Sequence, residues 1–217
     1  MKVFIDFDDV LFNTKKFIED IEVIFQKHGI SKNIFYETYQ SEDKISKTNY
    51  GNMFSYSPSL QFKKIKKKIK IDTKQLEKDF NVLVKNTKKY IFKDVDKFLN
   101  KMGKKDIFIL SFGTNNFQKE KIKNSGIEKY FNKIIVVAYA EKSRAIGKII
   151  GKSRESFYFI DDRVSFLEEV KNKYHFSKTF LIRRKEGRYG DKKNKYCDFS
   201  ANNLRTVLKI IKENAKK

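Results

Sequence analysis

The stretch that decides the fold is residues 1–14, MKVFIDFDDVLFNT, at the start of the chain. It contains an apolar run at residues 3–5 (VFI), and a run without polar alternation is typical of a strand buried on both faces. Three carboxylates, Asp6, Asp8 and Asp9, follow directly. Because carboxylates this close together repel one another and lose solvation at the end of a buried strand, we expect a positive partner beside them. A hard cation such as Mg²⁺, which prefers oxygen ligands, would provide it.

The spacing of the first two acids leads to a second expectation. Asp6 and Asp8 are two residues apart, so both side chains point the same way if the strand continues. One carboxylate could then attack a substrate while its neighbour moves protons. The alternative is a plain turn, where Asp and Asn are common. Three acids directly behind a strand of β-branched and aromatic residues favour the first interpretation.

The composition indicates a globular protein. The chain has 217 residues, 40% of them hydrophobic and 15% aromatic, which suits one domain with an insertion or two modest domains. No apolar run approaches the length of a membrane span, and the acidic N-terminal stretch does not resemble a signal peptide. The single cysteine, Cys197, has no second cysteine with which to form an internal disulfide. We therefore expect a cytoplasmic protein with a reduced, structural thiol and no membrane partner.

The net charge of +22 invites a nucleic-acid interpretation. Its make-up argues against sequence-specific contacts, because only seven of the 49 basic residues are Arg and none precedes Arg144. Arg is the side chain suited to bidentate phosphate and base contacts. The other basic residues are Lys, spread among Ile, Asn and Phe, which indicates a general compositional bias. Even the densest basic segment, residues 62–71, is better explained as a solvated face than as a polyanion site.

The segment after the opening stretch has helical periodicity. Apolar residues recur at i, i+3 and i+4 in residues 17–25 and 75–88, and a second short helix is expected over residues 34–39. Residues 41–60 are polar, with scattered aromatics and the only proline, and indicate a loop or a broken helix. No part of residues 15–95 has the apolar run of a buried parallel strand. We therefore expect a helical insertion over residues 15–95.

The second half of the chain alternates between apolar strands and helices. Strands are expected at residues 107–111, 134–138, 157–160 and 179–182, and helices at residues 95–102, 117–124, 142–151, 164–174 and 200–213, the last with Ser200 as its N-cap. Strands and helices in this order form βαβ units with right-handed crossovers. This predicts an α/β fold with a Rossmann-like parallel sheet covered on both faces. The core domain would comprise residues 1–14 and 96–217, with the insertion above one edge of the sheet.

Polar side chains follow the strands at the edge where open α/β sheets bind ligands. Besides the acids after the first strand, Ser111 closes the second strand, and Phe112-Gly113 with the amides that follow suit an anion. Asp161 and Asp162 close a later strand, and Lys142 opens a helix after the third strand. This inventory could hold a divalent cation and a phosphoryl group and attack the phosphorus.

These residues resemble the four motifs of the haloacid dehalogenase (HAD) superfamily. The matching motifs are Asp6-Phe7-Asp8-Asp9-Val10-Leu11, Ser111 at a strand end, Lys142 before a helix, and Phe159-Ile160-Asp161-Asp162. The segment from Ser111 to Ile122 is also similar to the family's second motif and the helix after it. The resemblance covers residues 1–14 and about 96–182. The insertion lies between the first and second motifs, where members with a helical C1-type cap carry it.

The resemblance implies a role for each acid. Asp6 would be the nucleophile and form an aspartyl-phosphate, while Asp8 would protonate the leaving group and then deprotonate water. Mg²⁺ would be bound by the Asp6 carboxylate, the Asp8 backbone carbonyl and an acid of the fourth motif. We prefer Asp162 for that ligand, because many members have Gly at the position of Asp161. Asp9 stands where Gly is common, which indicates a local difference in the backbone.

For the phosphoryl group, the resemblance implies contacts from Ser111 and from the backbone at Phe112 and Gly113. Lys142 would neutralise the phosphoryl charge together with that of the nucleophile. Lys148 is a rival for this role, but it lies inside the expected helix rather than at its start.

The resemblance implies a Mg²⁺-dependent phosphatase that hydrolyses a small phosphorylated metabolite or nucleotide. The second acid, Asp8, argues against haloacid dehalogenation, since members of that branch generally lack it. A phosphomutase remains an alternative and would differ from a phosphatase only in the group that accepts the phosphoryl group. The basic charge leaves open a polynucleotide-end phosphatase or a nucleic-acid-binding protein on the same fold. Tyr50, Phe54 and Tyr56 are candidates for contacts to the leaving group, or for the minor core of the insertion.

Overall fold

A six-stranded parallel sheet forms the centre of the molecule. The computed structural model describes residues 1–39, 45–48, 51–138 and 141–215, and only the backbone of residues 45–48 and 51–54. The strands lie in the order β5-β4-β1-β6-β7-β8. They are β1 (Val3–Ile5), β4 (Ile107–Phe112), β5 (Lys133–Val137), β6 (Tyr158–Asp161), β7 (Lys178–Ile182) and β8 (Phe199–Ala201). The predicted α/β fold with a Rossmann-like parallel sheet is confirmed.

β1 is a central strand, and its residues are apolar enough to be buried on both faces. Val3 pairs with Ile107 on one side and with Tyr158 on the other, and none of the β1 residues has exposed surface. A parallel sheet of this kind is stable only when both faces are covered. Asp6, which follows β1, therefore lies in the middle of the edge at which α/β sheets bind ligands.

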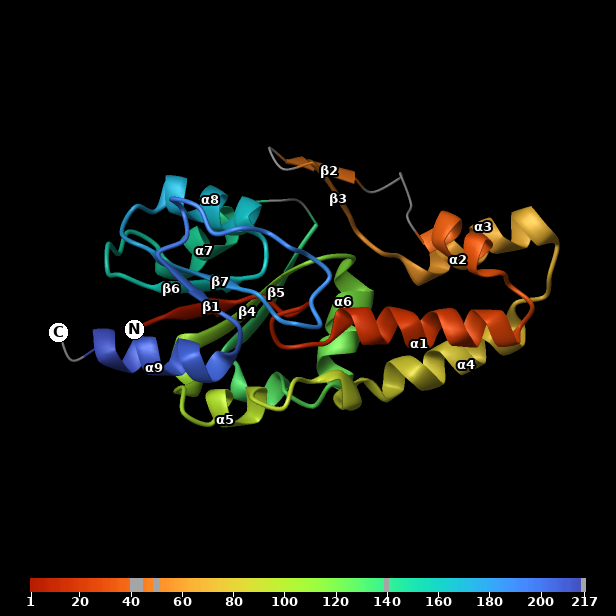
Figure 1. Cartoon of the computed structure of the whole chain (residues 1–217), viewed down its shortest axis with the longest axis horizontal. Coiled ribbons are helices and arrows are strands. Elements are labelled where there is room, and N and C mark those ends of the chain that lie inside the picture. The colour runs from red at the N-terminus through yellow and green to blue at the C-terminus, as the bar shows by residue number, and fades with distance from the viewer. Residues whose placement is uncertain (40–44, 49–50, 139–140, 216–217) are drawn as a thin grey trace.

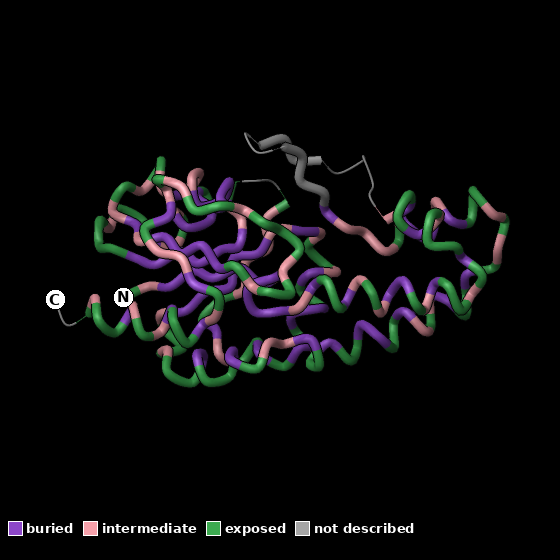
Figure 2. Tube along the Cα trace, viewed as in Figure 1, coloured by how far each residue is buried: buried purple, intermediate pink, exposed green. Residues whose placement is uncertain are grey.

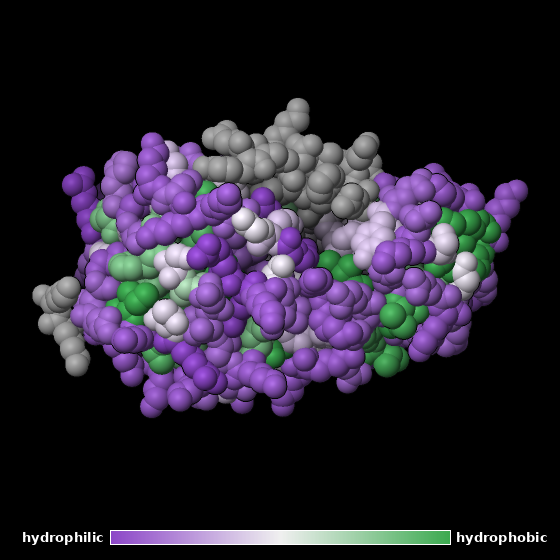
Figure 3. Space-filling view, viewed as in Figure 1, coloured by the Kyte–Doolittle hydropathy of each residue, from purple (hydrophilic) through white to green (hydrophobic). Residues whose placement is uncertain are grey.

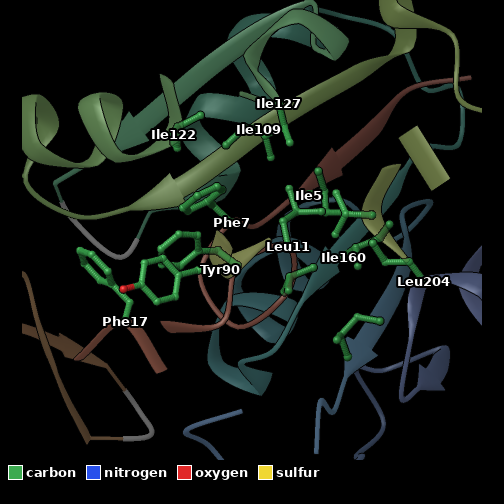
Figure 4. Packing of buried hydrophobic residues seen from close by; sticks show 14 of the residues in the cluster. Ile5, Phe7, Leu11, Phe17, Tyr90, Ile109, Ile122, Ile127, Ile160 and Leu204 are labelled. Atoms are coloured by element: carbon green, nitrogen blue, oxygen red, sulfur yellow. The ribbon is translucent and has the colours of Figure 1, made fainter. Parts of the chain in front are cut away.

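Helices cover both faces of the sheet (Figure 1). The helices of this part of the chain are α5 (Val95–Leu99), α6 (Asn115–Asn124), α7 (Lys142–Ile150), α8 (Val164–Lys173) and α9 (Leu204–Asn214). On one face α7 and α8 pack around Phe4 and Phe159. On the other face Ile5, Ile160 and Leu204 belong to one large cluster (Figure 4). Buried residues are concentrated in the sheet and between two helices of the insertion, α1 (Thr14–Lys27) and α4 (Lys74–Lys85) (Figure 2).

The insertion after β1 is mainly helical, as expected. It contains α1 (Thr14–Lys27), α2 (Lys32–Tyr39), β2 (Ile45–Thr48), β3 (Gly51–Phe54), α3 (Pro58–Ile69), α4 (Lys74–Lys85) and the 3-10 helix η2 (Thr87–Tyr90). α1 and α4 run side by side away from the sheet (Figure 1). The ring of Phe25 contacts Phe35, Phe62 and Phe80 at centroid distances of 5.1, 5.7 and 6.5 Å, which provides the insertion with a core of its own.

The two ends of the insertion are hydrogen-bonded to each other at the sheet. The Asn13 amide donates to the Tyr90 carbonyl at 2.8 Å, and the Phe92 amide donates to the Leu11 carbonyl at 3.1 Å. The chain therefore leaves and re-enters the core at one place. The domain boundaries expected from the sequence, 1–14 with 96–217 and 15–95, stay a prediction.

The expectation of a loop or broken helix over residues 41–60 is wrong. β2 and β3 form an antiparallel pair within it, in register from Ile45 with Phe54 to Thr48 with Gly51. A two-stranded hairpin bonds its backbone to itself and needs no long apolar run, so hydropathy did not reveal it. Tyr50 and the side chain of Phe54 lie outside the described residues. Tyr56 stacks on Tyr39, with ring centroids 4.4 Å apart.

A second correction concerns the C-terminal part. Ser200 does not cap a helix but lies within β8, a strand that the sequence did not predict because it is only three residues long. α9 begins at Leu204, and the side chain of Asn203 caps it by accepting a hydrogen bond from the Thr206 amide. β8 pairs with β7 and forms one edge of the sheet.

The visible surface is mostly hydrophilic (Figure 3), as the excess of Lys predicts. Across the described parts of the chain, every helix is too short or too polar to cross a membrane.

Candidate active site

A cavity of about 440 Å³ lies between the edge of the sheet and the insertion. Five of the predicted site residues line it: Asp6, Asp8, Phe112, Gly113 and Asp162. Three more are fully buried behind the lining: Ser111, Lys142 and Asp161. The structure therefore brings residues from four separate parts of the sequence to one place.

Lys142 joins two of the acids at the floor of the cavity. Its Nζ donates to Asp6 Oδ1 at 2.7 Å and to Asp161 Oδ2 at 2.6 Å, and none of its surface is exposed. Lys142 is the first residue of α7, so its side chain reaches back from the start of the helix toward the end of β1. Lys148, its rival in the sequence, is exposed on the same helix and does not line this cavity.

Asp6, Asp161 and Asp162 form a cluster that suits a hard cation. One carboxylate oxygen from each lies within 4.8 Å of the others. Asp161 already accepts from Lys142 and, at 2.9 Å, from the Arg163 amide. For Asp162, by contrast, we find no hydrogen bond or ion pair with any described residue. Asp162 and the second oxygen of Asp6 are thus the carboxylate groups free to bind a metal ion.

The cluster carries more negative charge than its lysine balances. Burial raises the pKa of Asp6 to about 7 against the pull of Lys142, and the neighbouring carboxylates add to the rise. Burial, with the charges of Asp161 and Asp9, raises the pKa of Asp162 well above its usual range. A divalent cation with oxygen ligands would relieve this repulsion, so the residues present fit Mg²⁺.

Asp8 is held by three donors. Its Oδ1 accepts from the Thr14 hydroxyl and from Lys121 Nζ, and its Oδ2 accepts from Gln118 Nε2, each at 2.6 Å. Burial alone would raise the pKa of Asp8, but the charges of Lys121 and Arg188 and the hydrogen bonds outweigh it and lower the pKa to about 2. Asp8 is therefore ionised and fixed in one orientation toward the cavity.

Asp9 is not one of the three carboxylates of this cluster. Its φ of 55° lies in the left-handed region, which Asp tolerates better than most residues with a side chain. Its buried Oδ2 accepts from Arg188 Nε at 2.6 Å. The local backbone difference expected at Asp9 is thus a left-handed residue that points its carboxylate at an arginine.

Ser111 and Gly113 lie at the end of β4. The Ser111 hydroxyl and the Gly113 amide both form hydrogen bonds with other groups of the protein. The Ser111 hydroxyl accepts from Gln118 at 2.8 Å but keeps its own proton to donate. The Gly113 amide donates to the Val137 carbonyl at 3.0 Å, and its φ of 156° favours glycine. The Gly113 amide thus serves the turn into α6. Phosphate binding by Ser111, Phe112 and Gly113 stays a prediction.

No family model and no curated protein matches the chain. Solved structures do match it, among them a protein from Burkholderia xenovorans LB400 described as a haloacid dehalogenase-like hydrolase. That match has a TM-score of 0.71 and 13% sequence identity, and it covers 97% of this chain and 96% of the other. The chain has the HAD-like hydrolase fold. The insertion after β1 lies in the position of a C1-type cap.

Two further HAD-like structures show the breadth of this fold. The HAD-hydrolase YfnB from Bacillus subtilis, solved bound to magnesium, has a TM-score of 0.65 and 13% identity, and the match covers 97% of each chain. L-2-haloacid dehalogenase from Xanthobacter autotrophicus, with chloropropionic acid covalently bound, has a TM-score of 0.65 and 14% identity over 97% of this chain and 98% of that one. At these identities the matches show the fold alone.

Sequence reasoning missed several residues of this candidate site. Gln118 and Lys121 are three residues apart on α6 and therefore share a helix face, but nothing marked Lys121 among the many lysines. Arg163, Arg188 and Tyr189 also line the cavity. The scarcity of Arg in the sequence could have pointed to Arg163 and Arg188, because compositional bias explains the few arginines less easily than the many lysines.

The acid cluster predicts how the stability of the HAD-like core depends on pH. Because the folded pKa values of Asp6 and Asp162 exceed their ordinary ones, the folded state binds these protons more tightly than the unfolded state. The contribution of Asp6 is fully present below about pH 4 and is lost as the pH rises through about 7, and that of Asp162 is lost in the same direction. At pH 8, the Tm of the metal-free protein in thermal unfolding should therefore be lower than the Tm of the same protein with Mg²⁺.

Asp162→Asn isolates this effect. The variant should be more stable than the wild type in metal-free buffer at pH 8 and should lose most of the Mg²⁺-dependent rise in Tm. Asp96→Asn, at an exposed position of α5, is the matched control and should keep that rise. A wild-type Tm at pH 8 that does not respond to millimolar Mg²⁺ would contradict the assignment.

Proposed function

We propose that the protein is a Mg²⁺-dependent phosphoric monoester hydrolase that works through an aspartyl-phosphate on Asp6. The observation that carries the proposal is the pairing of Asp6 with Lys142 at the floor of a cavity that Asp8 also lines. Lys142 donates to Oδ1 of Asp6 and so orients the carboxylate at the floor of the cavity. A nucleophile, a second carboxylate for proton transfer and a buried cation are the groups that the reaction needs.

In the first half of the reaction, a carboxylate oxygen of Asp6 attacks phosphorus. A new Asp6 O–P bond forms and the ester P–O bond breaks. The leaving oxygen takes a proton from Asp8, which is ionised before substrate binds and accepts that proton from the phosphomonoester monoanion. Thr14, Gln118 and Lys121 hold the carboxyl group in place for this transfer.

In the second half, Asp8 acts as the base. It takes a proton from water, whose oxygen attacks phosphorus as the Asp6 O–P bond breaks. Inorganic phosphate leaves and Asp6 is regenerated. Lys142 balances the charge of Asp6 throughout, and Ser111 would donate its hydroxyl proton to a phosphoryl oxygen.

Mg²⁺ would be held by the carboxylates of Asp6 and Asp162 and by the backbone carbonyl of Asp8. When bound, it would supply charge stabilisation at the phosphoryl oxygens. Asp161 would serve instead to orient Lys142, since both of its oxygens already have protein donors.

Haloacid dehalogenation is a second candidate, because dehalogenases are among the structures that share this fold. Asp8, fixed by three donors and lining the cavity, favours the phosphatase, since proton transfer to and from a leaving group needs such a group. The net charge of +22 supports a third reaction, removal of phosphate from polynucleotide ends. A cavity of about 440 Å³ suits a small substrate better.

One assay separates the three reactions. Purified protein is incubated with phenyl phosphate, with a 5′-phosphorylated oligonucleotide and with 2-chloropropionate, each with Mg²⁺ or with EDTA. We expect phosphate release from phenyl phosphate with Mg²⁺ only, and no chloride release. Chloride release would assign the protein to the dehalogenases, and phosphate release from the oligonucleotide alone would assign it to polynucleotide ends.

A further inference from the structure

Two arginines line the cavity on elements outside the predicted motifs. Arg163 directly follows the acids at the end of β6, and Arg188 lies in the segment between β7 and β8. Their side chains are 13% and 28% exposed, so both guanidinium groups are partly withdrawn from solvent. Neither is needed for the chemistry proposed above.

Each guanidinium group is held by an acid through its Nε. Arg188 Nε donates to Asp9 Oδ2 at 2.6 Å, and Arg163 Nε donates to Asp191 Oδ2 at 3.3 Å. Tyr189 joins the two, because its ring centroid lies 3.8 Å from Arg163 Cζ and 5.1 Å from Arg188 Cζ. Both arginines are thus oriented by a carboxylate and by a shared aromatic ring.

The terminal nitrogens of both groups have no acceptor within the described part of the protein, and neither set is shut off from solvent. Arg184 shows what a purely structural arginine looks like in the same chain. Its Nε and Nη2 donate to the Val10 carbonyl, and its Nη1 donates to Asp94. By contrast, Arg163 and Arg188 present unused N–H donors to a ligand cavity.

Arg188 lines the cavity together with Asp8, the proposed proton donor to the leaving oxygen, and with Tyr39 of the insertion. Its Nε is bonded to Asp9, the residue directly after Asp8. Lys142, which holds the nucleophile, is fully buried and does not line the cavity. An anionic group bound by Arg188 would therefore belong to the leaving group and not to the phosphoryl group under attack.

We propose that Arg188, assisted by Arg163, binds a second acidic group on the leaving group, so that the substrates are phosphomonoesters carrying a carboxylate or another phosphate. This rests on the proposed phosphatase function and specifies its substrate class. The planar fork of Arg, held at Nε, presents two parallel N–H donors that match the oxygens of either anion.

The test compares kcat/KM within two substrate pairs. 3-Phosphoglycerate differs from glycerol 3-phosphate by a carboxylate, and fructose 1,6-bisphosphate differs from fructose 6-phosphate by a phosphate. We expect the wild type to prefer the more acidic member of at least one pair by about tenfold or more. The pair that shows the preference identifies the anion.

The variant Asp9→Asn/Arg188→Gln removes both charges together, so no buried carboxylate is left unpaired. Asn also tolerates the left-handed backbone at position 9. We expect the preference to fall to about one, mainly through a higher KM for the acidic substrate. Arg154→Gln, at an exposed position beyond α7, is the matched control and should keep the wild-type ratio.

The outcomes separate this inference from the proposed function. Hydrolysis of phenyl phosphate without preference in either pair overturns the subsite and leaves the phosphatase standing. A preference that survives in the folded double variant also overturns it. If no ester is hydrolysed, phenyl phosphate included, the phosphatase itself is wrong and the subsite with it.

Discussion

Asp6→Asn is expected to lower the turnover of phenyl phosphate by about 10⁴-fold or more, because an amide cannot form the covalent phosphoryl intermediate. The substitution keeps the shape of the side chain, and its carbonyl oxygen can still accept from Lys142. At pH 8 without metal, the variant should be at least as stable as the wild type, since it removes a buried carboxylate whose pKa is raised to about 7. Steady-state kinetics and thermal unfolding of one preparation measure both effects.

Asp96→Asn is again the control, because it makes the same chemical change at an exposed position. It should match the wild type in turnover and in Tm. If Asp6→Asn is folded and still hydrolyses phenyl phosphate within tenfold of the wild type, Asp6 is not the nucleophile.

Lys142→Met is expected to have the second-largest effect. It leaves Asp6 and Asp161 buried without their shared cation, which should destabilise the fold by about 3 kcal/mol or more. Turnover with saturating Mg²⁺ should fall by about 10²-fold or more, because the charge that opposes Asp6 and the phosphoryl group is lost. Denaturant unfolding and phosphate release measure the two losses separately.

A double variant separates stability from catalysis. Lys142→Met/Asp161→Asn removes one carboxylate along with the lysine and should regain much of the stability without regaining turnover. Lys148→Met makes the same change on the exposed side of α7 and should change neither. Activity that follows Lys148 instead of Lys142 would show that the buried lysine is only structural.

The sequence was sufficient for the architecture because the core elements follow simple rules. β1, β4 and β6 begin with apolar runs at residues 3–5, 107–110 and 158–160, and each run is followed by polar residues at the same edge of the sheet. The hairpin of β2 and β3 and the three-residue strand β8 could not be found this way. Short strands are stabilised by the strands with which they pair, and the local amino-acid composition does not predict that pairing.

In the candidate site too, the sequence predicted some residues and not others. Asp6, Asp8 and Asp162 could be found because acids are costly behind a buried strand, so their presence there indicates a function. The choice of Lys142 over Lys148 also followed from position along the helix, and the structure places only Lys142 beside Asp6. Lys121 could not be found, since one lysine on a helix face resembles any other.

By itself, then, the order of residues determined the parallel sheet, the place of the insertion and the acids at the sheet edge, because burial and periodicity are local properties of a chain. Tertiary structure alone decided which charges meet. It turned three neighbouring acids toward three different cations, Lys142, Lys121 and Arg188, which are 136, 113 and 179 residues away in sequence. The energy of such a pair depends on distance and burial in space, and neither quantity is encoded in separation along the chain.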